Sequence, residues 1–475
     1  MTNNDIRESE CLTTKNLVKL VEKTKNELNK NVANVKVYKR RWFMLGLFIL
    51  SCMANNLQFV QYSIISNIVS RYYDVSLVAV DWTAMIYMLA FIPLVIPATH
   101  VFEKIGLRWT VVSSTFITCL GSWIKVFSAS PDRFYLAFVG QTLAATMQTC
   151  VLSSPSRLAA QWFHSEQVST ASSLGVFGTL TGIALGFLIP PMVVKNHVNL
   201  EEVGNEIQNL YYLYAGITTA IAFFVFIFFQ DEPKLPPTET RALLKLNRIE
   251  NKEGFIQPIK RLSRNKCFLL LCNSYGMNIG VLNAVATLLN QIFLMHFPGG
   301  EEDAGRIGLL IILTGMVGSV IFGVIIDKTH KFKETTVIIY FLTLCGQIIF
   351  AFSVYFEVQW MVYAASIFLG FFMSGYFALG YELCAEYTYP EPEFITSGIL
   401  NVANNVYGIA FILLFGKLME VYGDLAAHIG FCSALLVGFV TTILTKDEQR
   451  RENVRKAAKY KDIPLKEENF IKSVL

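Results

Sequence analysis

The sequence predicts an all-α protein that crosses a membrane twelve times, in two pseudo-symmetric halves of six helices each. Composition is the first observation behind this prediction: 53% of the 475 residues are hydrophobic and 16% are charged, whereas soluble chains carry about 25% charged residues. The charge distribution is the second, because 44 of the 76 charged residues lie in residues 1–41, 230–266 and 446–475, which flank two long apolar blocks. A short loop motif that occurs in both blocks is the third.

Each apolar block contains six runs of about the 20 residues that a helix needs to cross a bilayer. In the first block they lie near residues 42–67, 82–102, 109–127, 134–155, 168–194 and 211–229. In the second they lie near residues 267–295, 306–326, 335–356, 360–385, 396–416 and 426–445. We therefore expect a tail at 1–41, a six-helix half at 42–229, a middle loop at 230–266, a second six-helix half at 267–445 and a tail at 446–475.

The charges of the loops orient the predicted helices, because Lys and Arg concentrate in cytoplasmic loops. The tails, the middle loop and the short loops on the same side carry the basic residues, whereas the opposite loops carry acidic residues such as Glu201 and Glu301. Both termini are therefore predicted to be cytoplasmic, and the plasma membrane is the expected location because no retention signal ends the chain. A net charge of +4 does not indicate a nucleic-acid partner.

The loops after the second and eighth predicted spans carry an acid and a base at matched places. The first reads Thr99-x-x-x-Glu103-Lys104-x-Gly106-x-Arg108 and the second reads Gly323-x-x-x-Asp327-Lys328. This pattern resembles the short loop motif of the major facilitator superfamily, in which such residues latch the cytoplasmic ends of helices. The alternative is that any inner loop carries Lys and Arg. Paired halves of this kind hold a substrate between them near the midplane.

Charged side chains inside a span are costly and are functional candidates by default. Arg157 and the pair Glu382 and Glu386 lie at the inner ends of the fourth and tenth spans, which are equivalents in the two halves. We expect Arg157 and one of these carboxylates to form a cytoplasmic gate, with plain interfacial charges as the alternative. Lys125 lies near the outer end of the third span, where its ammonium is expected to reach the membrane surface.

The middles of the first, fifth, seventh, eighth and eleventh spans contain no Asp, Glu, Lys or Arg. This argues against proton coupling and against an anionic substrate, and it favours uncoupled, facilitated diffusion of a neutral or cationic solute. Amide side chains cluster in three of these helices, as substrate ligands or as interhelical hydrogen bonds. They are Asn55, Asn56, Gln58, Gln61 and Asn67, then Asn273, Asn278, Asn283, Asn290 and Gln291, then Asn401, Asn404 and Asn405.

Two further patterns have simpler interpretations. Gly178, Gly182 and Gly186 form a stripe of small residues in the fifth span, which predicts close packing against another helix. We find no nucleophile–base constellation, no phosphate-binding loop and no spacing of metal ligands, so the sequence predicts neither an enzyme nor a bound cofactor.

Several stretches together resemble the feline leukaemia virus subgroup C receptor family of facilitators, from about Arg40 to Lys446. They include Gln61-Tyr-Ser-Ile-Ile-Ser-Asn67, Asp81-Trp82, Trp123-Ile-Lys125, Pro155-Ser-Arg157, Gly186-Phe-Leu-Ile-Pro-Pro191, Thr287-Leu-Leu-Asn-Gln291 and Glu386-Tyr-Thr-Tyr-Pro390. The resemblance implies a twelve-helix facilitator with the major facilitator fold. It also implies transport of choline and ethanolamine, with haem transport attributed to the family as well.

The resemblance implies an aromatic cage that holds a quaternary ammonium by cation–π attraction. Asn55 and Met88 match the family's lining positions, whereas Phe59, Asn283, Leu180 and Asn405 stand where the family has Trp, Tyr, Gln and Gln. One aromatic wall is therefore missing. Either the cage is rebuilt, with Tyr275 or Tyr407 as candidates, or the substrate differs.

Alternatives to an amine carrier remain at this point. One is a transporter of haem or another hydrophobic solute. Another is a cell-surface receptor that does not transport, which would favour larger outer loops than the longest one here, residues 195–210. At the ends of the chain, residues 12–30 predict an amphipathic helix on the inner leaflet, and Ser473-Val474-Leu475 resembles a ligand for PDZ modules.

Overall fold

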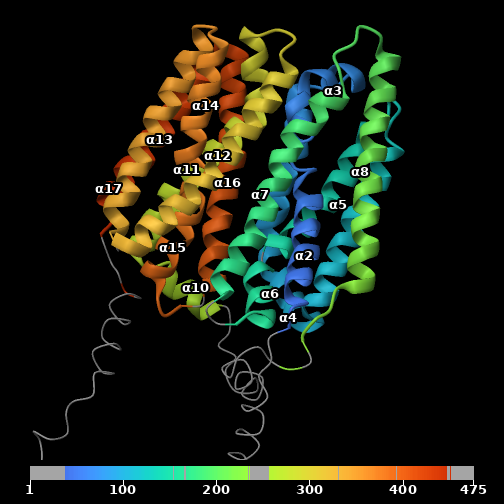
Figure 1. The fold of residues 1–475 in the computed structure, drawn as a ribbon. Coiled ribbons are helices and arrows are strands. Elements are labelled where there is room, and N and C mark those ends of the chain that lie inside the picture. Colours follow the sequence, from blue (N-terminus) through green and yellow to red (C-terminus); the bar gives the residue numbers. More distant parts are fainter. Residues whose placement is uncertain are drawn as a thin grey trace, which may run out of the picture.

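The structure is a computed structural model that describes residues 38–152, 154–164, 167–233, 235, 256–329, 331–391, 393–446 and 450. Long helices stand side by side in one bundle, and no strand occurs in these residues (Figure 1). The amphipathic helix predicted for residues 12–30, most of the middle loop and the C-terminal tripeptide lie outside the described residues.

The first half of the bundle contains the elements from α2 to α8 that the structure describes. They are α2 (Arg41–Asn56), η1 (Ser63–Ile65), α3 (Ser66–Tyr73), α4 (Leu77–Val126), α5 (Phe134–Leu152), α6 (Pro155–Trp162), α7 (Val168–Val193) and α8 (Leu200–Phe228). The long α4 contains the second and third predicted spans, which turn at Gly106, where φ is 81°. A β-carbon is strained at such a φ, so the glycine makes the turn possible.

The second half contains the remaining elements. They are α10 (Ile256–Leu262), α11 (Lys266–His296), α12 (Glu301–Thr329), α13 (Phe332–Tyr355), α14 (Gln359–Met373), α15 (Tyr376–Thr388), α16 (Glu393–Tyr422) and α17 (Asp424–Leu444). The tenth predicted span is made of α14 and α15, which are separated by the turn at Ser374 and Gly375.

Each predicted span falls mainly on helix, and nine helices in the described ranges are long and apolar enough to cross a membrane. The all-α polytopic fold is confirmed, and the structure is consistent with twelve crossings. Some boundaries differ from the prediction. For example, α8 begins at Leu200 rather than near residue 211, because Asn199 caps the helix and accepts the N–H of Glu201 at 3.0 Å.

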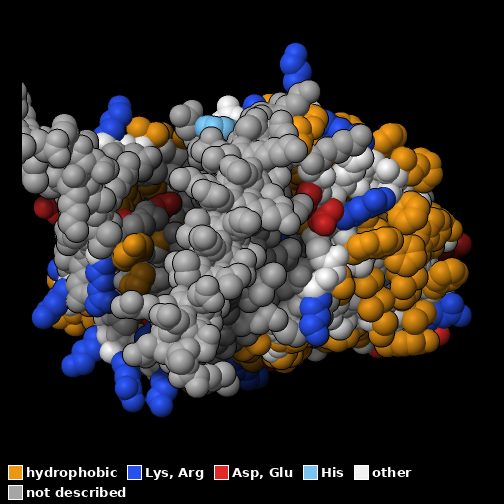
Figure 2. Space-filling view, turned by 90° about the horizontal axis from the view of Figure 1, so that it is seen from below, with side chains coloured by type: hydrophobic (Ala, Val, Ile, Leu, Met, Phe, Trp, Pro, Cys, Tyr) orange, Lys and Arg blue, Asp and Glu red, His pale blue; other side chains and the backbone are white. Residues whose placement is uncertain are grey.

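The bundle has two ends that differ in chemistry. We call the end with α3 and the α7–α8 and α11–α12 connections the upper end, and the end with α6, α10 and α15 the lower end (Figure 1). Seen from below, the lower end carries Lys and Arg side chains at its rim, and hydrophobic side chains cover part of the flank (Figure 2). Exposed Phe, Leu, Ile and Val side chains on the outward helix faces suit contact with lipid tails.

The predicted glycine stripe packs α7 directly against α2. A β-carbon at Gly178 would meet Ile49, one at Gly182 would lie 2.7 Å from the carbonyl oxygen of Met53, and one at Gly186 would lie 2.7 Å from that of Leu57. The prediction of close packing is confirmed. The largest buried hydrophobic cluster then continues from the first half into the second.

Candidate functional site

The two halves meet along a seam through the bundle. In the first half, η1, α4 and α7 reach the seam, and in the second half α11, α12 and α16 do. Within it α7 packs on α12, and α4 packs on α16. The sequence placed the substrate between the halves, so the predicted lining residues can be compared with this surface.

The first predicted span is broken where it approaches the seam. α2 ends at Asn56, residues 57–62 follow an irregular path, and η1 and α3 continue the crossing. The N–H of Phe59 donates to the carbonyl of Asn56 at 3.1 Å, so the backbone remains partly bonded at this break. Irregular backbone at membrane depth is tolerated where protein buries it or where it lines a cavity.

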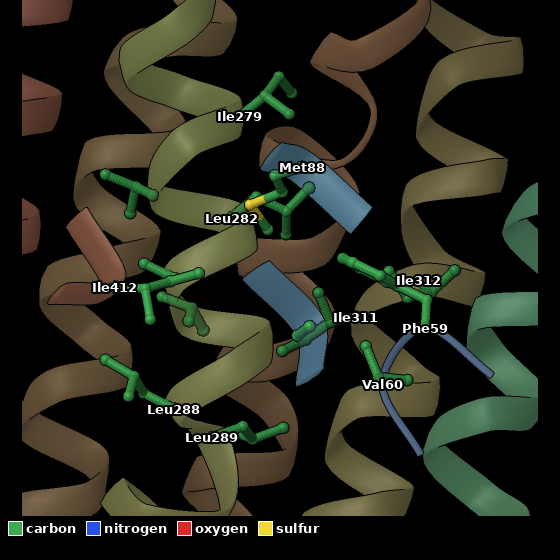
Figure 3. Close-up of a cluster of buried hydrophobic side chains, with 14 of the residues drawn as sticks. Phe59, Val60, Met88, Ile279, Leu282, Leu288, Leu289, Ile311, Ile312 and Ile412 are labelled. Atoms are coloured by element: carbon green, nitrogen blue, oxygen red, sulfur yellow. The ribbon is translucent and has the colours of Figure 1, made fainter. Parts of the chain in front are cut away.

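Three of the six predicted substrate-binding residues, Phe59, Met88 and Asn283, lie on segments that reach the seam, and we call this set the seam site. A β-carbon at Gly408 of α16 would lie 2.9 Å from the sulfur of Met88 and 3.3 Å from Nδ2 of Asn283. Phe59 belongs to the same buried cluster as Met88, and its ring meets that of Tyr87 edge to face at 5.3 Å. Figure 3 shows Phe59 and Met88 among isoleucines and leucines of the second half.

The other three predicted residues lie around this site in different ways. Leu180 of α7 is half-buried and packs against the cluster, and Asn405 of α16 is half-buried. Asn55 is buried within the first half instead, where its Nδ2 donates to Thr118 Oγ1 at 3.1 Å and to the carbonyl of Ala144 at 2.8 Å. Its amide thus joins α2 to α4 and α5.

The two tyrosines considered as replacement walls have different surroundings. Tyr275 is fully buried in the second half, with its ring centroid 6.0 Å from that of Tyr376 and 6.1 Å from that of Tyr381. Tyr407 lies on α16 beside Gly408, and its hydroxyl donates to Asn273. Tyr407 therefore adjoins the glycine on which Met88 and Asn283 meet.

Asn283 itself bridges two helices of the second half. Its Nδ2 donates to Oδ1 of Asn404 on α16 at 2.9 Å. This bond uses one of the two N–H donors of the Asn283 amide. No Asp, Glu, Lys or Arg is among Phe59, Met88, Asn283, Leu180 and Asn404, so the polar groups of the site are neutral.

Polar side chains join the two halves at the upper end, in what we call the upper network. Asp81 accepts Nε2 of Gln291 at 2.9 and 3.2 Å, and Asn290 accepts Oγ of Ser66 at 2.9 Å while donating to the carbonyl of Ile64 at 2.8 Å. Glu301 accepts both Asn67 at 2.9 Å and Asn196 at 2.8 Å, and Lys195 pairs with Glu302. The seam is thus bonded at this end.

Only part of the upper network could be foreseen. The sequence identified Asn67, Asn290 and Gln291 as clustered amides, and the structure shows that all three form hydrogen bonds between the halves. Asp81 was missed because the predicted second span began at residue 82, whereas α4 begins at Leu77 and buries the carboxylate. The seam therefore holds an ionisable group at its upper end, although the seam site does not.

The predicted position of Lys125 is wrong. Its side chain does not reach the membrane surface but is buried in the first half, with 1% of the residue exposed. Its ammonium donates to Oε1 of Gln58 at 2.7 Å and to Oε1 of Gln141. Two neutral amides therefore accept hydrogen bonds from Nζ of Lys125 in place of water. The sequence did not indicate this pairing.

The predicted latch residues lie at the lower end. Lys104 and Lys328 are exposed, whereas nothing is described of the Glu103 and Asp327 side chains. Arg157 on α6 is half-buried, and on α15 Glu382 is exposed and Glu386 is buried. The gate between Arg157 and these carboxylates stays a prediction.

Arg108 has an observed partner that the sequence did not indicate. Its backbone N–H donates to Oδ1 of Asp231 at 3.1 Å, and the carbonyl of Asp231 accepts Nε1 of Trp162 at 3.1 Å. The carboxylate lies against Gly106, where a β-carbon would be 3.0 Å from it. Asp231 thus caps the helix that follows Gly106 and connects it to α6.

Comparison with known proteins identifies the family. The Major Facilitator Superfamily pattern matches residues 43–413. The chain is 42% identical over 427 residues to the choline/ethanolamine transporter flvcr2b of Danio rerio, a match that covers 90% of this chain and 88% of that protein. It is 39% identical over 422 residues to the choline/ethanolamine transporter FLVCR2 of Homo sapiens, which covers 89% and 80%.

Solved structures agree in fold. The Escherichia coli fucose:proton symporter FucP has a TM-score of 0.59 at 14% identity and covers 86% of this chain and 98% of its own. A bacterial homologue of the human lysosomal transporter Spinster has a TM-score of 0.61 at 14% identity, with coverage of 86% and 95%. The chain therefore belongs to the Major Facilitator Superfamily and, within it, to the family of the FLVCR transporters, so it is a multi-pass membrane transporter of a small solute.

Proposed function

We propose that the chain carries a choline- or ethanolamine-like amine across the plasma membrane by alternating access, without coupling to a second ion. The observation that carries this proposal is the seam site, where a ring, a thioether and an amide lie between the halves with no charged side chain among them. The relatives named above are choline/ethanolamine transporters, which supports this substrate class.

The seam site offers a cation the contacts that an ammonium group needs. The face of the Phe59 ring can attract a quaternary ammonium by about 0.5–2 kcal/mol. Met88 adds a polarisable sulfur, and the amide oxygen of Asn283 can accept a hydroxyl or an ammonium N–H of the substrate. Both choline and ethanolamine carry a hydroxyl and a cation, so they suit a site with one ring and one acceptor.

The upper network acts as the gate that is closed in this structure. Its hydrogen bonds contribute about 0.5–1.5 kcal/mol each, so opening the upper end costs several kcal/mol in total. Comparable contacts must form at the lower end for both states to be populated. We assign that role to Arg157 with Glu382 or Glu386, together with the loop residues Glu103, Lys104, Arg108, Asp327 and Lys328.

The upper end faces the outside in this proposal, and both termini are cytoplasmic. Support comes from the basic rim of the lower end (Figure 2), because Lys and Arg gather on the cytoplasmic side of membrane proteins. In the closed-upper state the substrate exchanges between the seam site and the cytoplasm. When the upper network separates, it exchanges between the seam site and the outside.

Uptake of labelled choline and ethanolamine in cells that express the chain tests the substrate. We expect saturable uptake, and Phe59→Ala should raise KM about 2- to 30-fold, the loss of one cation–π contact. Phe116→Ala is the matched control, since Phe116 lies on α4 with 62% of its surface exposed. Asn283→Tyr should lower KM by restoring a second aromatic wall.

Three outcomes would contradict the substrate assignment. Amine uptake that appears only in Asn283→Tyr would mean that the natural substrate differs. Uptake of a fluorescent metalloporphyrin without uptake of either amine would favour haem. A chain that reaches the cell surface and moves none of these solutes would favour a receptor.

Replacing sodium outside the cell by potassium tests whether the membrane potential drives uptake. Potassium depolarises the membrane, and a monovalent cation driven by potential alone should accumulate less, by about 40-fold for a 100 mV change. Collapsing only the pH gradient with nigericin should leave choline uptake unchanged. A loss of uptake on nigericin treatment would show proton coupling and overturn the proposal of a facilitator.

A further inference from the structure

A buried ammonium group, that of Lys125, is hydrogen-bonded to the break in the first predicted span. Lys125 is 1% exposed, and Gln58 and Gln141, whose oxygens receive its ammonium, are fully buried. The Nζ atom also lies 5.7 Å from the ring centroid of Tyr62. Within the described part of the chain, no carboxylate lies within ion-pair distance of Lys125.

The partners of Lys125 bond the broken backbone itself. Nε2 of Gln141 donates to the carbonyl of Gln58 at 2.7 Å, and Oε1 of Gln141 also accepts Nε2 of Gln61 at 3.1 Å. Gln58 in turn donates to the carbonyl of Ala54 at 3.2 Å. The carbonyl of Gln58 belongs to the peptide unit that leads into Phe59, so these bonds fix the backbone next to the seam site.

Helix packing brings the lysine to this place. A β-carbon at Gly121 would lie 2.5 Å from the carbonyl oxygen of Gly140, and one at Gly140 would lie 2.8 Å from Cγ of Lys125. α4 and α5 can therefore approach closely, and the lysine stem passes over Gly140. Burial of an ammonium group is costly unless its hydrogens are bonded, so a lysine retained here needs both amide oxygens.

We propose that Lys125 is a positioning residue for substrate binding: it orients Gln58 and Gln141 so that the break after α2 holds the Phe59 ring in the seam. This inference rests on the proposed function, in which Phe59 contacts the substrate. Lys125 touches no substrate in this arrangement and acts only through the two glutamines.

A double-mutant cycle in the full-length chain tests the proposal. Lys125→Met keeps the length of the stem and removes the donors, and it should raise KM for choline about 10-fold with kcat changed less than 2-fold. In a Phe59→Ala background the same substitution should change KM less than 2-fold, since the ring to be positioned is gone. Ser114→Ala, a buried α4 residue whose hydroxyl bonds only its own helix, is the control and should leave KM unchanged.

Lys125→Gln keeps an N–H donor group without the charge, and it covers the case in which Lys125→Met does not fold. It should raise KM by less than Lys125→Met would, about 3-fold, and again have no effect without Phe59. Equal KM changes in the presence and absence of the Phe59 ring would overturn the proposal, because a purely structural defect does not depend on that ring.

A readout without substrate separates this inference from the proposed function. A fluorinated phenylalanine at position 59 should give one 19F resonance that shifts or broadens in Lys125→Gln and stays unchanged in Ser114→Ala. Wild-type chain that carries neither amine would refute the proposed function, while the 19F comparison would still decide the role of Lys125. An unchanged 19F resonance in Lys125→Gln would refute that role.

Discussion

The first helices of the two halves occupy equivalent places, yet one is broken and the other is continuous. α2 stops at Asn56, whereas α11 runs unbroken from Lys266 to His296. Their amides have correspondingly different partners. Asn56 at the end of α2 and Gln58 in the break donate to carbonyls of α2, whereas on α11 Gln291 bonds the opposite half.

This difference reflects the backbone of the break, whose Gln58 carbonyl accepts a side-chain amide, Nε2 of Gln141. The break leaves peptide groups that need hydrogen bonds within a medium that supplies none. The continuous helix has no such need, so its amides bond other elements: Asn290 and Gln291 bond the first half, and Asn283 bonds α16. The break is thus fixed by side-chain hydrogen bonds, whereas α11 is fixed by the backbone hydrogen bonds of its own helix. Three experiments can refute or refine this contrast.

Glycine-to-alanine substitutions should have the largest effect on the free energy of unfolding. The loss should be greater where α7 packs on α2 than where α11 packs on α16. Gly182→Ala places a methyl group 2.7 Å from the backbone of α2, which cannot move alone, so we expect a loss of about 2 kcal/mol. Gly276→Ala on α11 meets the Tyr407 ring, which can rotate, and should cost below about 1 kcal/mol. Thermal unfolding in detergent measures both values.

Gly46→Ala on α2 is the control, because nothing lies within 4 Å of its added β-carbon. It should be neutral or stabilising. Equal losses at Gly182 and Gly276 would show that the α2–α7 and α11–α16 contacts tolerate an added β-carbon equally well.

Removal of an α11 amide should have the next largest effect. Asn290→Leu leaves the carbonyl of Ile64 buried without its partner, and we expect about 2 kcal/mol less stability for the closed upper end. A cysteine introduced at Ile64, in a chain without native cysteines, should then react about 30-fold faster with an impermeant thiol reagent added outside.

Asn273→Leu is the matched control on the same helix, because Asn273 bonds Tyr407 and Thr441 within the second half. It should not change the rate of labelling. A similar acceleration by both substitutions would show that α11 amides do not serve the contact between halves in particular.

Substitutions at the lower end should have the smallest effects. Asp231→Ala removes the cap on the helix after Gly106 and should cost about 1 kcal/mol. Arg261→Met removes a bidentate pair with Glu391, at 2.6 and 2.9 Å, but the arginine is half-exposed, so the loss should stay below about 1 kcal/mol. Thermal unfolding in 0.1 and 0.5 M salt should show salt dependence for Arg261 only. Salt-sensitive losses at both positions would contradict the assignment of a salt-screened ion pair to Arg261 alone.

The fold could be predicted because apolar length and loop charge are local properties of the sequence. The break at residues 57–62 could not, since Gln58, Phe59 and Gln61 read as an ordinary polar–apolar mixture within a span. The same holds for Lys125: a lysine near the end of a span usually extends to water. Its burial depends on Gln141, whose proximity follows only from the packing of Gly121 against Gly140.

The positions of the predicted lining residues could be foreseen only in part, and their role in binding stays a prediction. Met88 and Asn283 meet at Gly408, and sequence resemblance had indicated both. Asn55 matched the family's lining position. The sequence does not give the direction in which its side chain points, and in the structure its amide bonds Thr118 and Ala144. Asp81 lay one residue outside the predicted span, so its burial was not expected.

The burial of Lys125 has a consequence for how the chain enters the membrane. A lysine can add up to about 2.5–3.5 kcal/mol to the insertion of a span, depending on its depth. The hydrogen-bond partners of Lys125, Gln58 and Gln141, lie on the first and fourth spans. Both glutamines have therefore been synthesised before the second half is made. The first half can therefore fold as a unit during synthesis, with its one buried ammonium already bonded.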